Sequence, residues 1–60
     1  MKYRIEEVDK NGRFYYDDLY DSIEEAIEVI KEYEAENDAE GIARYSITYY
    51  VVDENNEVVY

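Results

Sequence analysis

The clearest pattern in the chain is an alternation of apolar and polar residues that begins at position 43. On one face of an extended strand it places Ala43, Tyr45, Ile47, Tyr49 and Val51, and on the other Arg44, Ser46, Thr48, Tyr50 and Val52. Because Ser46 and Thr48 are polar, the second face is the expected solvent side of a sheet. Tyr50 and Val52 are then predicted to be exposed apolar groups on that face.

Residues 2–8 and 13–20 are predicted to form a β-hairpin, and two registers of this hairpin are open. A two-residue turn at Asn11 and Gly12 places four residues on one face, namely Tyr3, Ile5, Phe14 and Tyr16. A type I turn with a bulge at Gly12 instead places Tyr3 and Ile5 with Tyr15 and Leu19, and sets Val8 opposite Phe14. We favour the bulged form, because Asp at the first turn position and Gly at the last suit it.

A short phrase occurs twice, as VDKNGRFYY at 8–16 and as VDENNEVVY at 52–60. In each copy an Asp that can bond its own backbone two residues on is followed by Asn and by a residue tolerant of positive φ. Each copy is therefore predicted to be a hairpin, which makes residues 57–60 a final strand. Hairpin turns draw on few residue types, so similar turn chemistry explains the likeness better than an internal duplication does.

Between the two copies of the phrase, the spacing of the apolar residues changes to that of an α-helix. Ser22 and Glu25 match a capping box, in which the hydroxyl accepts from the Glu25 N–H and the carboxylate reaches back to the Ser22 N–H. The apolar stripe of this helix comprises Ile23, Ala26, Ile27, Ile30 and Tyr33. Gly41 offers a stop, but carboxylates crowd the negative end of the helix dipole, so we expect fraying near Asn37.

Two hairpins that flank one helix predict an α+β domain of β-β-α-β-β order, with a four-stranded antiparallel sheet covered by the helix on one face. The 60 residues are expected to form a single compact domain, 1–60. Strand order is not predicted by the pattern.

The net charge of the chain limits the kinds of partner that this domain can contact. Seventeen acids against six bases give a net charge of −11, which opposes direct contact with nucleic acid and with anionic membranes. The chain has no Cys and no His, which excludes disulfides and removes the commonest metal ligand and general base. We therefore expect no cofactor and no metal site, and the absence of a leader or apolar span predicts a cytoplasmic protein.

Catalytic candidates are few. The hydroxyl nucleophiles other than Tyr are Ser22, which is assigned to the helix cap, and Ser46 and Thr48 on the predicted exposed face. Asp53, Asn55 and Glu57 alternate like the first ligands of a calcium loop, but Val58 stands where that loop needs Gly. We expect a turn there rather than a metal site, and no enzyme activity.

The carboxylates themselves are the main candidate for function. One interpretation is that the net charge keeps a small, tyrosine-rich protein soluble. The other is a phosphate mimic that fills the basic groove of a nucleic-acid enzyme, and it is indicated by the accumulation of like charges at i,i+4, which destabilise a helix. Of the tyrosines, Tyr3, Tyr33, Tyr45 and Tyr49 are predicted to be core, while three others suit the surface. The predicted partner-binding residues are Asp17, Asp18, Asp21, Glu24, Glu25, Glu28, Glu32, Glu36, Glu40, Tyr16, Tyr50 and Tyr60.

With VDKNG at 8–12, SIEEA at 22–26 and VDENN at 52–56, the chain resembles the small acidic proteins of bacteriophages and mobile elements. That class includes anti-CRISPR and anti-restriction proteins that mimic nucleic acid, and it shares size and composition rather than a motif. The resemblance implies an inhibitor that binds a basic, nucleic-acid-handling host protein. The alternative is a structural scaffold or self-assembling domain, of natural or designed origin, that pairs as a homodimer through residues 57–60.

Overall fold

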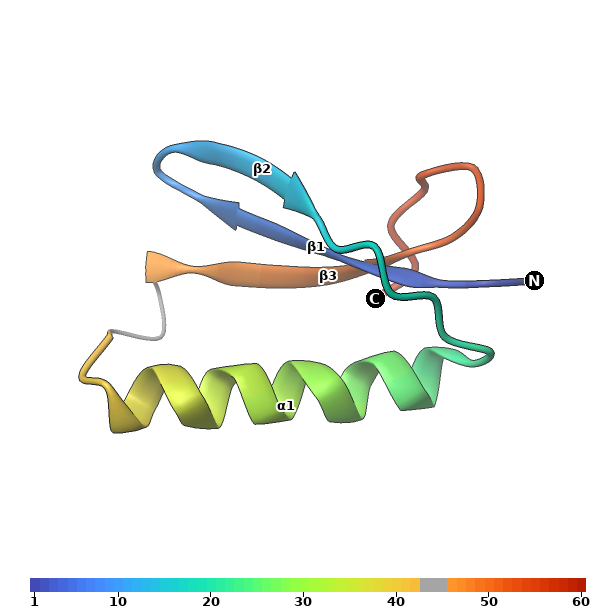
Figure 1. The fold of residues 1–60 in the computed structure, drawn as a ribbon. Coiled ribbons are helices and arrows are strands. Elements are labelled where there is room, and N and C mark those ends of the chain that lie inside the picture. The colour runs from blue at the N-terminus through green and yellow to red at the C-terminus, as the bar shows by residue number, and fades with distance from the viewer. Residues whose placement is uncertain (43–45) are drawn as a thin grey trace.

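A computed structural model describes residues 1–42 and 46–60. In these residues the element order is β1 (Arg4–Asp9), β2 (Gly12–Tyr15), α1 (Ile23–Ala39) and β3 (Thr48–Val52). The three strands form one antiparallel sheet in the order β2-β1-β3, and α1 runs along one face of it (Figure 1). The α+β class is confirmed, with β1 at the centre of the sheet.

The fourth strand was a wrong prediction. Residues 57–60 form only an isolated bridge between Val52 and Val58, beside β3. Next to it, Val59 N–H donates to the Val51 carbonyl at 2.8 Å and the Tyr60 carbonyl accepts from Val51 N–H at 3.2 Å. Two successive residues thus lie opposite one, as in a bulge, and the ladder does not become regular.

The hairpin of β1 and β2 has neither of its predicted turns. Asp9 pairs with Gly12 and Val8 with Arg13, so Lys10 and Asn11 form a two-residue loop. The bulged form that we favoured is wrong, because Glu7, not Val8, lies opposite Phe14. The face assignment of the other register holds, since Tyr16 N–H donates to the Ile5 carbonyl at 3.0 Å. This register packs the Tyr16 ring against the core and leaves Leu19 exposed, and an aromatic ring buries a large apolar area.

Turn chemistry is shared by the two repeated phrases, as predicted. The Oδ1 atom of Asp9 accepts from Asn11 N–H, and that of Asp53 accepts from Asn55 N–H, both at 2.8 Å. Positive φ follows in each case, at Gly12 (126°) and at Asn56 (62°). The turns therefore match in chemistry although only the first one joins two regular strands.

The core lies between α1 and the facing side of β1 and β3. Its fully buried members are Ile5, Ala26 and Val51, with Ile30 nearly so, and half-buried aromatic rings surround them. The predicted core residues Tyr3, Tyr33 and Tyr49 pack against this cluster, which confirms them. Tyr45 lies outside the described residues.

Residue Val52 was predicted to be exposed on the second face of its strand and is fully buried. The reason is the tail, which bridges to Val52 and follows the outer edge of β3. The predicted start of this strand at Ala43 is also wrong for the described part, because Ser46 and Ile47 precede β3. Ala43 and Arg44 lie outside the described residues.

Both ends of α1 have a defined cap. The Ser22 Oγ accepts from Glu25 N–H at 3.2 Å, which confirms the predicted start. At the other end Gly41 has a φ of 81°, while Ile42 N–H donates to the Asn37 carbonyl and Gly41 N–H to that of Asp38. These two bonds make a Schellman motif, so the helix continues to Ala39 and the expected fraying near Asn37 is wrong.

The cap at Ser22 should contribute measurably to stability. We expect Ser22→Ala to lower the free energy of unfolding by about 1 kcal/mol, because the Glu25 N–H would lose its acceptor. Urea denaturation followed by circular dichroism measures this change. Ser46→Ala, at an exposed position outside any described strand or α-helix, is the control and should leave the midpoint nearly unchanged.

Candidate functional site

A row of carboxylates runs along the outside of α1. Glu24, Glu28, Glu32 and Glu36 follow one another at i,i+4, and all four are exposed. Each step of four residues rises about 6 Å and turns about 40°, so the row winds slowly along one side of the cylinder. Glu25 is exposed beside the start of the row, and Glu40, which caps the helix, is exposed at its end.

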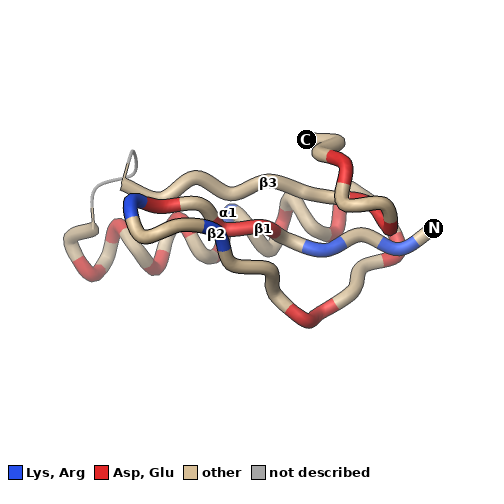
Figure 2. The backbone as a smooth tube through the Cα atoms, turned by 90° about the horizontal axis from the view of Figure 1, so that it is seen from above, with Lys and Arg blue, Asp and Glu red and all other residues tan. Residues whose placement is uncertain are grey.

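The charge density of this helix approaches that of one nucleic-acid strand. Its 17 residues contain seven carboxylates and one ammonium, a net charge of −6. At about 1.5 Å per residue the helix is about 25 Å long, so it carries one net charge per about 4 Å. One strand of duplex DNA carries one charge per about 3.4 Å of axis. Figure 2 shows these acidic positions along α1, on the far side of the sheet.

In residues 1–42 and 46–60, one ion pair involves this row of four carboxylates. It joins Lys31 Nζ and Glu28 Oε1 at 3.5 Å. Both side chains are well exposed, so this pair is weak. In the described part of the chain the row therefore keeps most of its charge available to a partner.

The three predicted aspartates just before the helix differ in their surroundings. Tyr16 bonds to Ile5 and Tyr20 to Tyr3, so the three residues between them oppose only Arg4 and bulge outward. Asp17 and Asp18 are exposed in this bulge. It adds two exposed carboxylates to the segment that precedes α1.

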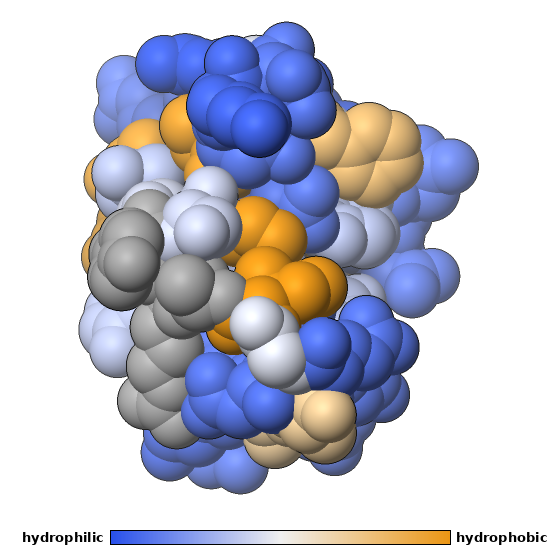
Figure 3. Space-filling view, turned by 90° about the vertical axis from the view of Figure 1, so that its left-hand side faces the viewer, coloured by the Kyte–Doolittle hydropathy of each residue, from blue (hydrophilic) through white to orange (hydrophobic). Residues whose placement is uncertain are grey.

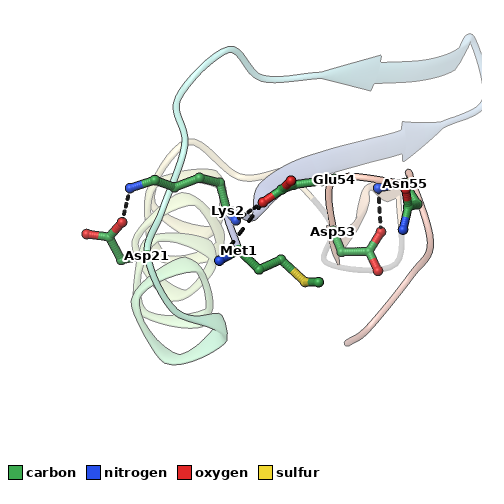
Figure 4. Close-up of polar contacts among 6 residues, drawn as sticks. All are labelled: Met1, Lys2, Asp21, Asp53, Glu54 and Asn55. Atoms are coloured by element: carbon green, nitrogen blue, oxygen red, sulfur yellow. Dashed lines mark hydrogen bonds and ion pairs between the residues drawn. The ribbon is translucent and has the colours of Figure 1, made fainter.

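Asp21 is already engaged within the chain. It accepts a hydrogen bond from the Lys2 Nζ, as Figure 4 shows, and this contact lowers the pKa of Asp21 and raises that of Lys2. Lys2 N–H also donates to Glu54 Oε1 at 2.7 Å. Asp21 therefore ties the N-terminal segment to the start of α1, and it is less available to a partner than the helix carboxylates.

The three predicted surface tyrosines occupy three different positions. Tyr60 is exposed in the tail, and Tyr50 is half-buried on the sheet face that points away from α1. Tyr16 is also half-buried, and its ring stacks on that of Tyr33 with 5.2 Å between ring centroids. The structure thus separates these aromatics from one another and from the acidic row.

Tyr16 belongs to an aromatic cluster that the sequence did not indicate. Its hydroxyl donates to Glu7 Oε1 at 2.5 Å, and Tyr33 in turn lies 5.6 Å from Tyr49 between centroids. The Tyr49 hydroxyl accepts from Asn37 Nδ2 at 2.9 Å. Burial, and then the bond to Glu7, raises the pKa of Tyr16 well above its usual value, and burial also raises the pKa of Tyr49.

This cluster predicts alkaline instability. A tyrosine whose folded-state pKa is raised keeps its proton better in the folded state than in the unfolded state, so its stabilising effect is complete below about pH 10 and is lost above it. We expect the melting temperature to fall as pH rises from about 9.5 to 11.5. Tyr16→Phe should make that fall shallower, whereas Tyr60→Phe should not; equal slopes for wild type and Tyr16→Phe would contradict the assignment.

A separate hollow lies at the end of the molecule shown in Figure 3, where apolar side chains are exposed among polar ones. Its volume is about 550 Å³, and its described lining comes from the β1–β2 turn and from residues that follow α1, including Val8, Ile42 and Ile47. Asp9 in this lining holds the Asn11 N–H of the turn. None of the twelve predicted site residues lines this hollow.

No group of three or more acidic, His or Cys side chains in residues 1–42 and 46–60 is placed to hold a metal ion. In the same residues, no helix is both long and apolar enough to span a bilayer. No protein family, curated protein or solved structure matches the chain.

Proposed function

We propose that this chain is a non-enzymatic interaction domain whose acidic helix binds the cationic groove of a nucleic-acid-binding protein. The observation that carries the proposal is the exposed row Glu24, Glu28, Glu32 and Glu36, on a helix whose net charge per unit length is close to that of one strand. A groove built for phosphates would receive these carboxylates with the same lysines and arginines.

The rigidity of the helix supports this proposal. α1 is capped at both ends and packs Ala26 and Ile30 into the core, so the carboxylates are held on a fixed surface before binding. A preorganised surface loses little conformational entropy when it binds. Folding already overcomes the repulsion among these carboxylates, so binding does not have to bring them together.

Inhibition is the biological outcome that we propose for this contact, in line with the resemblance to small acidic phage proteins. A domain that occupies the groove excludes the nucleic acid from it. The intrinsic charge of −11 keeps the domain itself away from the phosphates.

The alternative, self-assembly through residues 57–60, has less support. The tail does expose Val58 and Tyr60, which a second copy could cover. Its backbone, however, pairs with β3 through a bulge and an isolated bridge, which makes it an irregular template for another strand. The geometry therefore favours the helix surface over the tail.

Affinity capture tests the proposal. The chain is immobilised, exposed to a bacterial lysate at low salt, and washed with single-stranded DNA or with a salt gradient. We expect the captured proteins to be nucleic-acid-binding proteins that DNA displaces and that elute steeply with salt. Captured proteins that resist both DNA and high salt would contradict the proposal.

A matched variant makes this capture specific. It carries Gln at Glu24, Glu28, Glu32 and Glu36, and Asp at four exposed positions elsewhere: Leu19, Ser46, Asn55 and Val58. Its net charge is the same, but the row is gone. We expect it to capture far less; equal capture would mean that total charge, and not the helix surface, determines binding.

A further inference from the structure

The face of the sheet that points away from α1 carries two arginines and one glutamate, a net charge of +1, whereas the helix carries −6. The register places on it Arg4, Glu6, Val8, Arg13, Tyr15, Thr48, Tyr50 and Val52. Figure 2 looks onto this face, and no helix of the described residues covers it.

Glu6 is the unusual member of this face. Glu6 is only 2% exposed, and the register places it between Tyr15 on β2 and Tyr50 on β3. A buried carboxylate is costly unless it is paired. Its ion-pair partner is Arg13, whose Nη1 lies 3.5 Å from Glu6 Oε2 while the arginine side chain stays 69% exposed. Glu6 thus positions a guanidinium at the surface.

Arg4 is held in place on the same face. Its Cζ lies 5.2 Å from the centroid of the Tyr15 ring, and its Nη2 donates to Asn56 Oδ1 at 2.8 Å. Because a guanidinium already covers the Tyr15 ring, this ring is not free to stack a nucleobase. The remaining N–H groups of two ordered arginines favour a ligand that carries carboxylates.

The chain itself contains a matching ligand in α1. Arg13 pairs with Val8, which lies four residues along β1 from Arg4. With the usual rise along a strand and the usual spacing between strands, the Cα atoms of Arg4 and Arg13 are therefore about 14 Å apart. Carboxylates eight residues apart on the helix, such as those of Glu24 and Glu32, are separated by about 12 Å. At physiological salt the Debye length is about 8 Å, so the repulsion between charges farther apart than this is largely screened, whereas contacts between the two faces are screened less.

We propose that the open sheet face binds the acidic helix of a second copy of this chain. Helix and sheet face are different surfaces, so the contact is head-to-tail and can repeat from copy to copy. Each contact covers one acidic row. Self-association would therefore compete with the partner binding proposed above and would store the protein in an inactive form at high concentration.

Sedimentation velocity in 150 mM and in 500 mM NaCl tests this proposal. Between about 20 µM and 1 mM we expect the weight-average mass to roughly double at low salt and to stay nearly monomeric at high salt. The double variant Arg4→Glu with Arg13→Glu should remain monomeric, whereas Lys10→Glu with Ser46→Asp and Val58→Asp, with the same charge change at exposed positions, should still associate. A monomeric wild type at 1 mM in low salt overturns the proposal.

A mixture of two variants tests the head-to-tail contact most directly. The helix variant with Gln at Glu24, Glu28, Glu32 and Glu36 leaves the sheet untouched, so it tests the contact even if loss of Arg13 unfolds the chain. Alone, the helix variant and the double arginine variant should each be monomeric. Mixed, they should form a dimer that grows no further, since only one complementary pair of faces remains. Self-association of the helix variant alone would overturn the proposal.

Discussion

Replacing Ile5 by Ala is expected to leave a large part of the population unfolded at 25 °C. Ile5 is fully buried in the central strand, on the side that faces α1, and it contacts the same cluster as Ala26, Ile30 and Val51. An Ile→Ala change at such a site costs about 2–5 kcal/mol. A domain of this length has only about 3–9 kcal/mol of stability in total.

Equilibrium denaturation in urea measures this loss. Leu19→Ala is the matched control, because Leu19 is 60% exposed in the bulge before α1 and should cost less than about 0.5 kcal/mol. If Ile5→Ala were no more costly than Leu19→Ala, the core would not lie between β1 and the helix.

Neutralising the acidic row is expected to change binding and stability in opposite directions. With Gln at Glu24, Glu28, Glu32 and Glu36, four exposed charge pairs with the partner are lost, each worth up to about 1 kcal/mol. Affinity for a captured partner should fall about 100-fold at low salt, and the dependence of affinity on salt should become shallower.

The same variant should fold more stably than the wild type. It removes three like-charge contacts at i,i+4, each of which costs about 0.2–0.5 kcal/mol, so the free energy of unfolding should rise by about 1 kcal/mol. Binding is measured by calorimetry on the captured partner, and stability is measured by urea denaturation. A variant that loses both affinity and stability would mean that the row supports the fold, contrary to our account.

Local chemistry could be predicted from the sequence because it depends on neighbouring residues. The Ser22 cap and the two Asp turns each need only a side chain and a backbone N–H two or three residues away. The apolar stripe of α1 was found for the same reason, since i,i+3 and i,i+4 spacing places its members on one side. Gly41 also indicated the end of the helix, although the crowded carboxylates argued for an earlier one.

Features that depend on strand register could not be predicted in this way. A shift of one residue moves every side chain to the other face, and Asp9 can hold Asn11 in more than one register. Burial of Tyr16 and exposure of Leu19 followed from that choice.

Contacts between residues far apart in the sequence could not be predicted either. The bond between Tyr16 and Glu7 and the burial of Glu6 between Tyr15 and Tyr50 depend on which strands become neighbours. The burial of Val52 depends on a tail that returns without forming a regular strand. The acidic row was correctly placed on the outside of the helix, because charge and helical spacing suffice to predict it. Whether it binds a partner remains a prediction.

Amide chemical shifts of the isotopically labelled chain, recorded as a captured partner is added, test the central claim most directly. Our account predicts that the changes concentrate in α1 around Glu24–Glu36, that β1 and β2 change little, and that single-stranded DNA reverses the effect by displacing the chain. Changes confined to the sheet or the tail, with α1 undisturbed, would contradict it.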